Sequence, residues 1–90
     1  MEKNEEILKI KEKLINLDPN NKYLEVIDQS AMHSEHLDTK KQVTHLKIIM
    51  VSDKFSGVSR VDRSKMIHNL LKDDFDEGLH ALSLDLKDKL

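Results

Sequence analysis

Imidazole is the side chain in this sequence best suited to metal binding or acid–base chemistry. The 90 residues include five histidines and no cysteine. The lack of cysteine excludes a disulfide framework, a thiol nucleophile and a thiolate zinc site within this chain. One tyrosine, two phenylalanines and no tryptophan complete the aromatic set. Any chemistry must therefore depend on imidazole, carboxylate or hydroxyl groups.

Two of the histidines lie close together in a polar stretch. His33 and His36 fall within residues 28–42, which show no apolar periodicity and predict a long loop. Imidazoles on such a loop could reach a soft or borderline metal. The spacing alone favours two solvent-facing loop residues, so the metal site remains the alternative at this stage.

The other three histidines fall on predicted regular elements. His45 starts a predicted strand on the face opposite Leu46, which favours an exposed position. His68 lies on a predicted helix and is expected at the edge of the core. His80 shares the alternation of Leu82, which favours a partly buried place at the end of a strand. Histidines distant in sequence form a metal site only if the fold brings them together, and periodicity does not show this.

Most enzyme signatures are missing. Gly57 and Gly78 are isolated, so there is no glycine-rich phosphate loop, and no serine lies in a nucleophile elbow. An acidic cluster surrounds Phe75, and it lacks the ligand spacing of a calcium-binding loop. A solvated helix end is the favoured interpretation of this cluster: Asp73, Asp74, Asp76 and Glu77. We therefore expect no catalysis.

The spacing of apolar residues predicts the elements that must position these groups. A helix is expected over Glu5–Leu17, with Asn4 as its N-cap, because apolar residues recur there at helical spacing and Asp18-Pro19 follows. Alternating residues predict three strands, over Tyr23–Ile27, His45–Val51 and His80–Leu86.

A second long helix is expected after the second strand. Ser59 with Asp62 resembles a capping box and predicts a helix through Leu71, with Val61 in its apolar stripe. A short extra helical turn is expected near Asp74. The order α-β-β-α-(short α)-β predicts an α+β two-layer sandwich, in which helices cover one face of a three-stranded sheet. Residues 1–90 are expected to form one domain.

Charge and hydropathy exclude further classes. Lys plus Arg is 15 and Asp plus Glu is 17, so the net charge of −2 argues against a polybasic arm or an acidic tail. The longest apolar run, Ile48–Val51, is far too short to span a bilayer. The charged start of the chain resembles neither a secretory signal nor a transit peptide. We expect a cytoplasmic protein with no membrane contact, or a mitochondrial matrix protein whose presequence has been removed.

Five segments together resemble the BolA family over about Leu24 to Leu86. They are Leu24-Glu25-Val26 with Asp28-Gln29-Ser30, then Thr44-His45-Leu46-Lys47-Ile48, then Val51-Ser52-Asp53-Lys54-Phe55-Ser56-Gly57, then Arg63 to Leu71, and finally His80-Ala81-Leu82. The order is that of the family and the spacing is close to it, except that the stretch from His33 to His45 is longer than expected. Where the family often has Arg-His-Arg, this chain has Arg63-Ser64-Lys65.

The resemblance implies a class II KH-like fold and a partner. BolA proteins form heterodimers with monothiol glutaredoxins, and the two can share a bridging [2Fe–2S] cluster. Two ligands would come from this chain: His80, and His33 on the loop, with His36 as a competing loop ligand. The thiolates would come from the glutaredoxin cysteine and glutathione. The isolated chain is expected to hold no cofactor and to be a monomer or weak homodimer.

The resemblance therefore implies an adaptor in iron–sulfur cluster assembly, trafficking or iron regulation. The alternative is a transcriptional regulator, because KH-like folds bind nucleic acid and some bacterial BolA proteins are regarded as regulators. A helix-turn-helix-like surface would then offer phosphate contacts that are sensitive to salt. The candidate residues are Lys54, Gly57, Arg60, Arg63 and Lys65. A pI of about 6.2 and scarce aromatic residues place this alternative second.

Overall fold

A computed structural model describes residues 3–30 and 43–90 of the chain. The elements follow the predicted order, with one addition, a 3-10 turn after the second strand. They are α1 (Lys3–Leu17), β1 (Tyr23–Asp28), β2 (His45–Val51), η2 (Asp53–Phe55), α2 (Arg60–Leu70), α3 (Lys72–Glu77) and β3 (Ala81–Lys87). Among the described residues, no helix has the length and apolar character needed to cross a bilayer.

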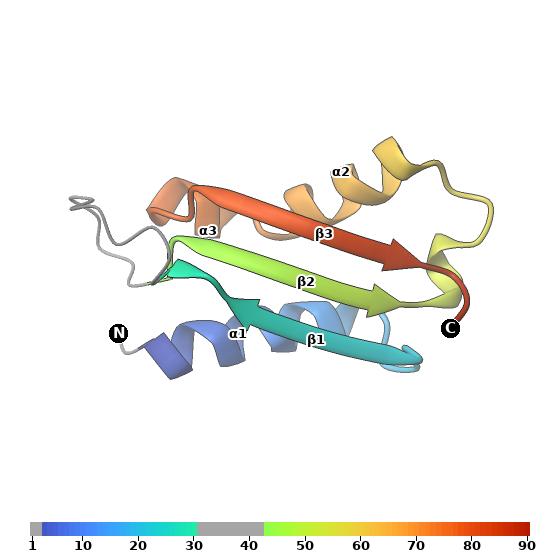
Figure 1. The fold of residues 1–90 in the computed structure, drawn as a ribbon, viewed down its shortest axis with the longest axis horizontal. Coiled ribbons are helices and arrows are strands. Elements are labelled where there is room, and N and C mark those ends of the chain that lie inside the picture. The colour runs from blue at the N-terminus through green and yellow to red at the C-terminus, as the bar shows by residue number, and fades with distance from the viewer. Residues whose placement is uncertain (1–2, 31–42) are drawn as a thin grey trace.

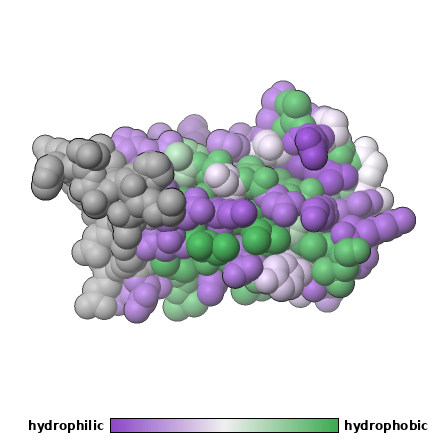
Figure 2. Space-filling model, in the orientation of Figure 1, coloured by the Kyte–Doolittle hydropathy of each residue, from purple (hydrophilic) through white to green (hydrophobic). Residues whose placement is uncertain are grey.

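The three strands form one mixed sheet with β2 in the centre. β1 pairs antiparallel with β2, and β3 pairs parallel with β2 on the other side. α1, α2 and α3 lie behind the same face of the sheet (Figure 1). The predicted α+β architecture, with helices on one face, is confirmed. The opposite face is a mixture of hydrophilic and hydrophobic side chains (Figure 2).

Alternation along β2 builds the centre of the core. Leu46, Ile48 and Met50 are buried on the helix side, because successive strand residues point to opposite faces. Ile10 and Leu14 of α1 are fully buried against them. The rest of the buried apolar cluster comes from Val43, Phe55, Ile67, Leu71 and Leu79. Segments from both ends of the chain thus share one core.

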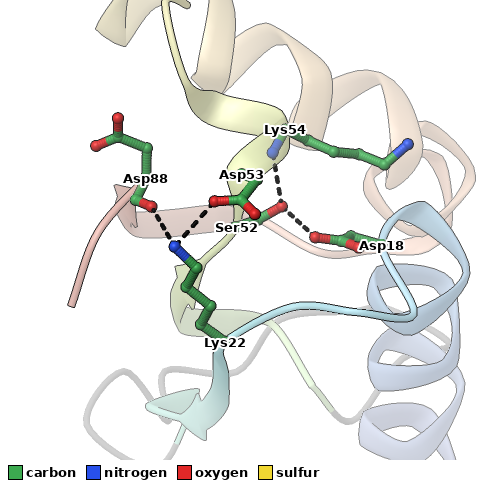
Figure 3. Close-up of polar contacts among 6 residues, drawn as sticks. All are labelled: Asp18, Lys22, Ser52, Asp53, Lys54 and Asp88. Atoms are coloured by element: carbon green, nitrogen blue, oxygen red, sulfur yellow. Dashed lines mark hydrogen bonds and ion pairs between the residues drawn. The ribbon is translucent and has the colours of Figure 1, made fainter.

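A polar network joins two turns at one end of the sheet. The buried Ser52 hydroxyl donates a hydrogen bond to the Asp18 carboxylate and accepts one from the Lys54 backbone N–H at 3.1 Å (Figure 3). Lys22 Nζ lies 2.9 Å from Asp53 Oδ1. The Ser52 hydrogen bond, aided by the Asn20 N–H and the Lys54 charge and opposed by burial, holds the pKa of Asp18 below its ordinary value.

Three expectations about the helices are wrong in detail. Asn4 lies inside α1, which already includes Lys3, so it is not the N-cap. Val61 is 64% exposed, because the inward face of α2 passes through Ile67 and not through its first turn. Asp74 is buried and lies 2.6 Å from Lys13 Nζ, so this carboxylate ties α3 to α1 and is not a solvated residue. The Ser59 cap is confirmed, since its hydroxyl accepts the Asp62 N–H at 3.1 Å.

Candidate functional site

His80 lies immediately before β3, with a fixed backbone and an exposed side chain. Its N–H donates to the Thr44 carbonyl at 2.7 Å, and the Ala81 N–H donates to the same oxygen at 3.2 Å. The preceding residue, Leu79, is buried, and its N–H donates to the Asp74 carbonyl at 2.9 Å. The prediction that His80 is partly buried is wrong, because Leu79 occupies the core position and the strand begins only at Ala81.

A second group of hydrogen bonds closes the same end of the sheet. The Ser30 side chain accepts the Thr44 N–H at 2.8 Å and the His45 N–H at 3.2 Å. The Gln29 N–H donates to the His45 carbonyl at 2.9 Å. Ser30 and Thr44 are both buried. Ser30 and Thr44, which lie on either side of residues 31–42, are therefore joined to each other, and Thr44 also binds the backbone of His80. They lie where β1 ends and β2 begins (Figure 1).

His45 is the second imidazole at this end of the sheet. Its ring centroid lies 6.2 Å from that of His80, with the two planes at 63°. Its Nδ1 lies 2.9 Å from Thr44 Oγ1. The residue is half-buried, so the expected exposed position is wrong. His45 starts β2, opposite Ala81 in the parallel register, and that pairing brings the two rings together.

Sequence reasoning did not connect His45 with His80. Alternation gives the face on which a strand residue lies, but it does not give the register between strands that are distant in sequence. The usable signal was that both histidines stand at the first residues of predicted strands, and that a predicted helix connects these strands. Such strands run parallel and start at the same edge of the sheet.

The described residues do not complete a metal site by themselves. No group of three or more His, Asp or Glu side chains within residues 3–30 and 43–90 is arranged to hold a metal ion. His33 and His36 lie outside the described residues, so their predicted role stays a prediction. His68 is exposed on α2, and its ring stacks on Phe75 with centroids 5.1 Å apart. The stacking on Phe75 at the edge of the core explains the position of the His68 ring without a metal-binding role.

The residues predicted to contact nucleic acid belong to one region but differ in character. Lys54, Arg60 and Lys65 are exposed, and Gly57 has a φ of 74°, which a residue with a side chain rarely adopts. Arg63 is half-buried and structurally engaged. Its Nε donates to the Val58 carbonyl at 2.8 Å and its Nη1 to the Leu86 carbonyl at 3.0 Å. Arg63 therefore joins the start of α2 to the end of β3.

Comparison with known proteins decides the family. The family model described as BolA-like protein matches residues 15–89. The chain belongs to the BolA family. Among solved structures, the BolA domain of SufE1 from Arabidopsis thaliana superposes with a TM-score of 0.76 at 40% identity, covering 89% of this chain and 87% of that one. BolA1 from Mus musculus gives a TM-score of 0.71 at 26% identity, covering 89% and 62%.

Curated relatives extend the comparison to several organisms. The UV-induced protein uvi31 of Schizosaccharomyces pombe is 44% identical over 61 residues, which cover 63% of this chain and 60% of the relative. SufE-like protein 1 of Arabidopsis thaliana is 41% identical over 83 residues, which cover 86% of this chain and 22% of that protein. The DNA-binding transcriptional regulator BolA of Escherichia coli is 34% identical over 62 residues, covering 69% and 56%. This BolA-family chain thus spans at most 60% of the length of these three curated relatives.

Proposed function

We propose that this BolA-like chain is an adaptor that binds a monothiol glutaredoxin and co-ligates a bridging [2Fe–2S] cluster. Its role would be in cluster assembly, trafficking or iron regulation. The observation that carries the proposal is the position of His80, an exposed imidazole whose backbone N–H is bound by the Thr44 carbonyl, while the Thr44 N–H is bound by Ser30. Ser30 and Val43 are the described residues on either side of residues 31–42, which contain the candidate second ligand.

Both candidate loop histidines follow the anchored Ser30 closely in sequence. His33 follows the anchored Ser30 by three residues, which span at most about 11 Å of backbone, and His36 follows it by six, at most about 22 Å. The family resemblance assigns His33. His45, 6.2 Å from His80 between ring centroids, is the described imidazole nearest to this arrangement. It must therefore be tested as a ligand or as a support for His80.

The donor set fits a shared cluster. Neutral imidazoles can replace two thiolates on one iron of a [2Fe–2S] cluster, and doing so raises its reduction potential. A chain without cysteine cannot supply the remaining thiolates. The glutaredoxin cysteine and glutathione would provide them, so the proposal requires a partner. Because the imidazoles must be neutral to bind iron, acidic solution should disfavour assembly.

The test is anaerobic reconstitution of the full chain with a monothiol glutaredoxin, iron, sulfide and glutathione. Visible circular dichroism would be compared for the native chain and the His80→Ala, His33→Ala, His36→Ala and His45→Ala variants. His68→Ala is the matched control, because His68 is exposed and packs only at the core edge. The proposal predicts a new spectrum with the native chain and the control, and its loss with His80→Ala. Spectra that do not change when the chain is added would contradict it.

Calorimetry with the metal-free glutaredoxin separates partner binding from cluster ligation. His80→Ala should leave binding to the metal-free partner nearly intact while removing the cluster spectrum. If His36→Ala abolishes the spectrum and His33→Ala does not, the adaptor role stands and the loop ligand is His36.

A second candidate function is DNA binding. The Escherichia coli and Vibrio cholerae relatives, 34% and 31% identical over 62 residues each, are both named DNA-binding transcriptional regulators. Lys54, Arg60 and Lys65 are exposed cations near the start of α2. A fluorescence titration with duplex DNA at several salt concentrations tests this function. No binding at ~50 mM salt would exclude it, because phosphate contacts are strongest at low salt.

A further inference from the structure

A cavity between α2 and the end of β3 has no part in the proposed cluster site. Its volume is about 360 Å³, and it is lined by Arg60, Arg63, Ser64, Leu84, Asp85, Leu86 and Lys87. This volume lies near the lower end of the range of small-molecule sites. The start of α2 and the end of β3 lie at one end of the molecule, and the end of β1 and the start of β2 lie at the opposite end (Figure 1).

The helix side of the cavity presents polar groups from one face of α2. Arg60, Arg63 and Ser64 stand at i, i+3 and i+4, which places them on the same face of the helix. Arg63 is held in place by two backbone carbonyls and lies over the Phe55 ring, with its Cζ 5.9 Å from the ring centroid. The second amino group of its guanidinium takes part in neither of these hydrogen bonds. Folding has therefore already ordered this side chain, which lowers the entropy cost of binding a ligand.

Arg60 provides a second guanidinium with donors to spare. It is exposed and makes no ion pair or side-chain hydrogen bond with residues 3–30 or 43–90. Lys87 adds a third cation from β3. The one carboxylate in the lining, Asp85, lies 3.9 Å from Lys87 Nζ, and both side chains are well exposed. The lining thus has an excess of positive charge.

The strand side of the cavity is the outer edge of β3, which pairs with no further strand in the described sheet. The Lys87 carbonyl accepts the Ser52 N–H on the β2 side, and the Leu86 carbonyl accepts Arg63 on the other side. Backbone groups alternate along a strand, so the N–H groups of Leu84 and Leu86 face away from β2. They add neutral donors to the cationic groups of the cavity.

We infer that this cavity binds the phosphoryl group of a small molecule. Guanidinium forks match the paired oxygens of phosphate and carboxylate. A dianionic phosphoryl group satisfies three cations and a serine hydroxyl better than a single carboxylate does. The cavity accepts one such group, and its size favours a small phosphorylated compound over an extended nucleic-acid strand.

The test is a titration of the ¹⁵N-labelled full chain with inorganic phosphate at pH 7.5, with ionic strength held constant by sodium chloride. The inference predicts saturable amide shifts confined to residues 60–64 and 84–87. Arg60→Ala should weaken binding about tenfold, the loss expected for one charge-assisted hydrogen bond. Arg60 is chosen over Arg63 because its exposed side chain makes no ion pair or hydrogen bond within the described part of the chain, so its removal should leave the fold intact.

Lys65→Ala is the matched control, because it removes one exposed positive charge from the same helix outside the cavity. Its effect should be less than about twofold, the scale of a screened surface charge. No saturable shift up to ~50 mM phosphate, or equal weakening by both variants, would overturn the inference.

A parallel titration with a single-stranded oligonucleotide distinguishes the source of the phosphate. The small-molecule inference is wrong if the oligonucleotide binds, inorganic phosphate does not bind, and the amide shifts extend to Lys54 and Lys65. In that case this surface binds nucleic acid. Shifts confined to the cavity with inorganic phosphate support it.

Discussion

Ser30→Ala tests how the candidate site is held together. The Ser30 hydroxyl accepts two backbone N–H groups, from Thr44 at 2.8 Å and from His45 at 3.2 Å. Alanine removes the acceptor and leaves both donors in place. The Thr44 carbonyl in turn accepts the His80 N–H, so the change acts on the backbone that holds the proposed ligand.

The magnitude follows from burial. Thr44 is only 7% exposed, so its N–H bears the cost of a buried donor without an acceptor, about 1–3 kcal/mol. His45 is half-buried, so its N–H contributes toward the lower end of that range. We expect a loss of about 2–4 kcal/mol in the free energy of unfolding, a large part of the roughly 5–13 kcal/mol typical of a domain this size. The melting temperature should fall by at least about 8 °C.

Urea denaturation measures the loss of stability, and amide hydrogen exchange shows where it arises. Exchange at Thr44, His45 and His80 should accelerate more than exchange in α2. Ser83→Ala is the matched control, because Ser83 is exposed on β3, and its stability should stay within about 0.5 kcal/mol of the native chain. If Ser30→Ala is as stable as Ser83→Ala and leaves the Thr44 amide protected, the Ser30 hydrogen bonds do not hold this end of the sheet.

Two further predictions concern stability away from the site. The hydrogen bond from the Ser52 hydroxyl lowers the pKa of Asp18 from its ordinary value of 3.8. The ionised Asp18 carboxylate therefore stabilises the fold fully above pH 3.8, and this stabilisation is lost as the pH falls through the lower folded pKa. Asp18→Asn should therefore be less stable than the native chain at pH 7, and acid denaturation curves should show the difference shrinking below about pH 4; a constant difference down to pH 2 would contradict this. Leu14→Ala should lower the free energy of unfolding, measured by urea denaturation, by about 2–5 kcal/mol, because Leu14 is 0% exposed. Leu8→Ala should lower it by less than about 1 kcal/mol, because Leu8 is 56% exposed. Equal losses would show that α1 does not pack as described.

Local patterns predicted the elements well because the cause of each element is local. Alternation from His45 to Val51 gave the limits of β2, and Leu46, Ile48 and Met50 are buried as that alternation requires. The Ser59 cap gave the start of α2, because capping depends on a hydroxyl and an N–H three residues apart.

The errors concern contacts between segments that are distant in sequence. Asp74 looked like one of several solvated acids, but the packing of α3 against α1 buries it beside Lys13. His45 and His80 lie close together only because β2 and β3 pair in a parallel register. Arg63 looked like a phosphate contact, and its carbonyl partners Val58 and Leu86 became visible only in the fold. No local pattern encodes such pairings.

The most direct test of the adaptor proposal is pulsed electron paramagnetic resonance of the reduced shared cluster. The ¹⁵N-labelled chain would be reconstituted with unlabelled glutaredoxin and glutathione, so that any strongly coupled ¹⁵N must come from this chain. The proposal predicts two coupled imidazole nitrogens in the native complex and in His68→Ala, and no strongly coupled ¹⁵N with His80→Ala, because the shared cluster does not form. A cluster without strongly coupled ¹⁵N, or a coupling that survives in His80→Ala without change, would contradict the ligand role of His80.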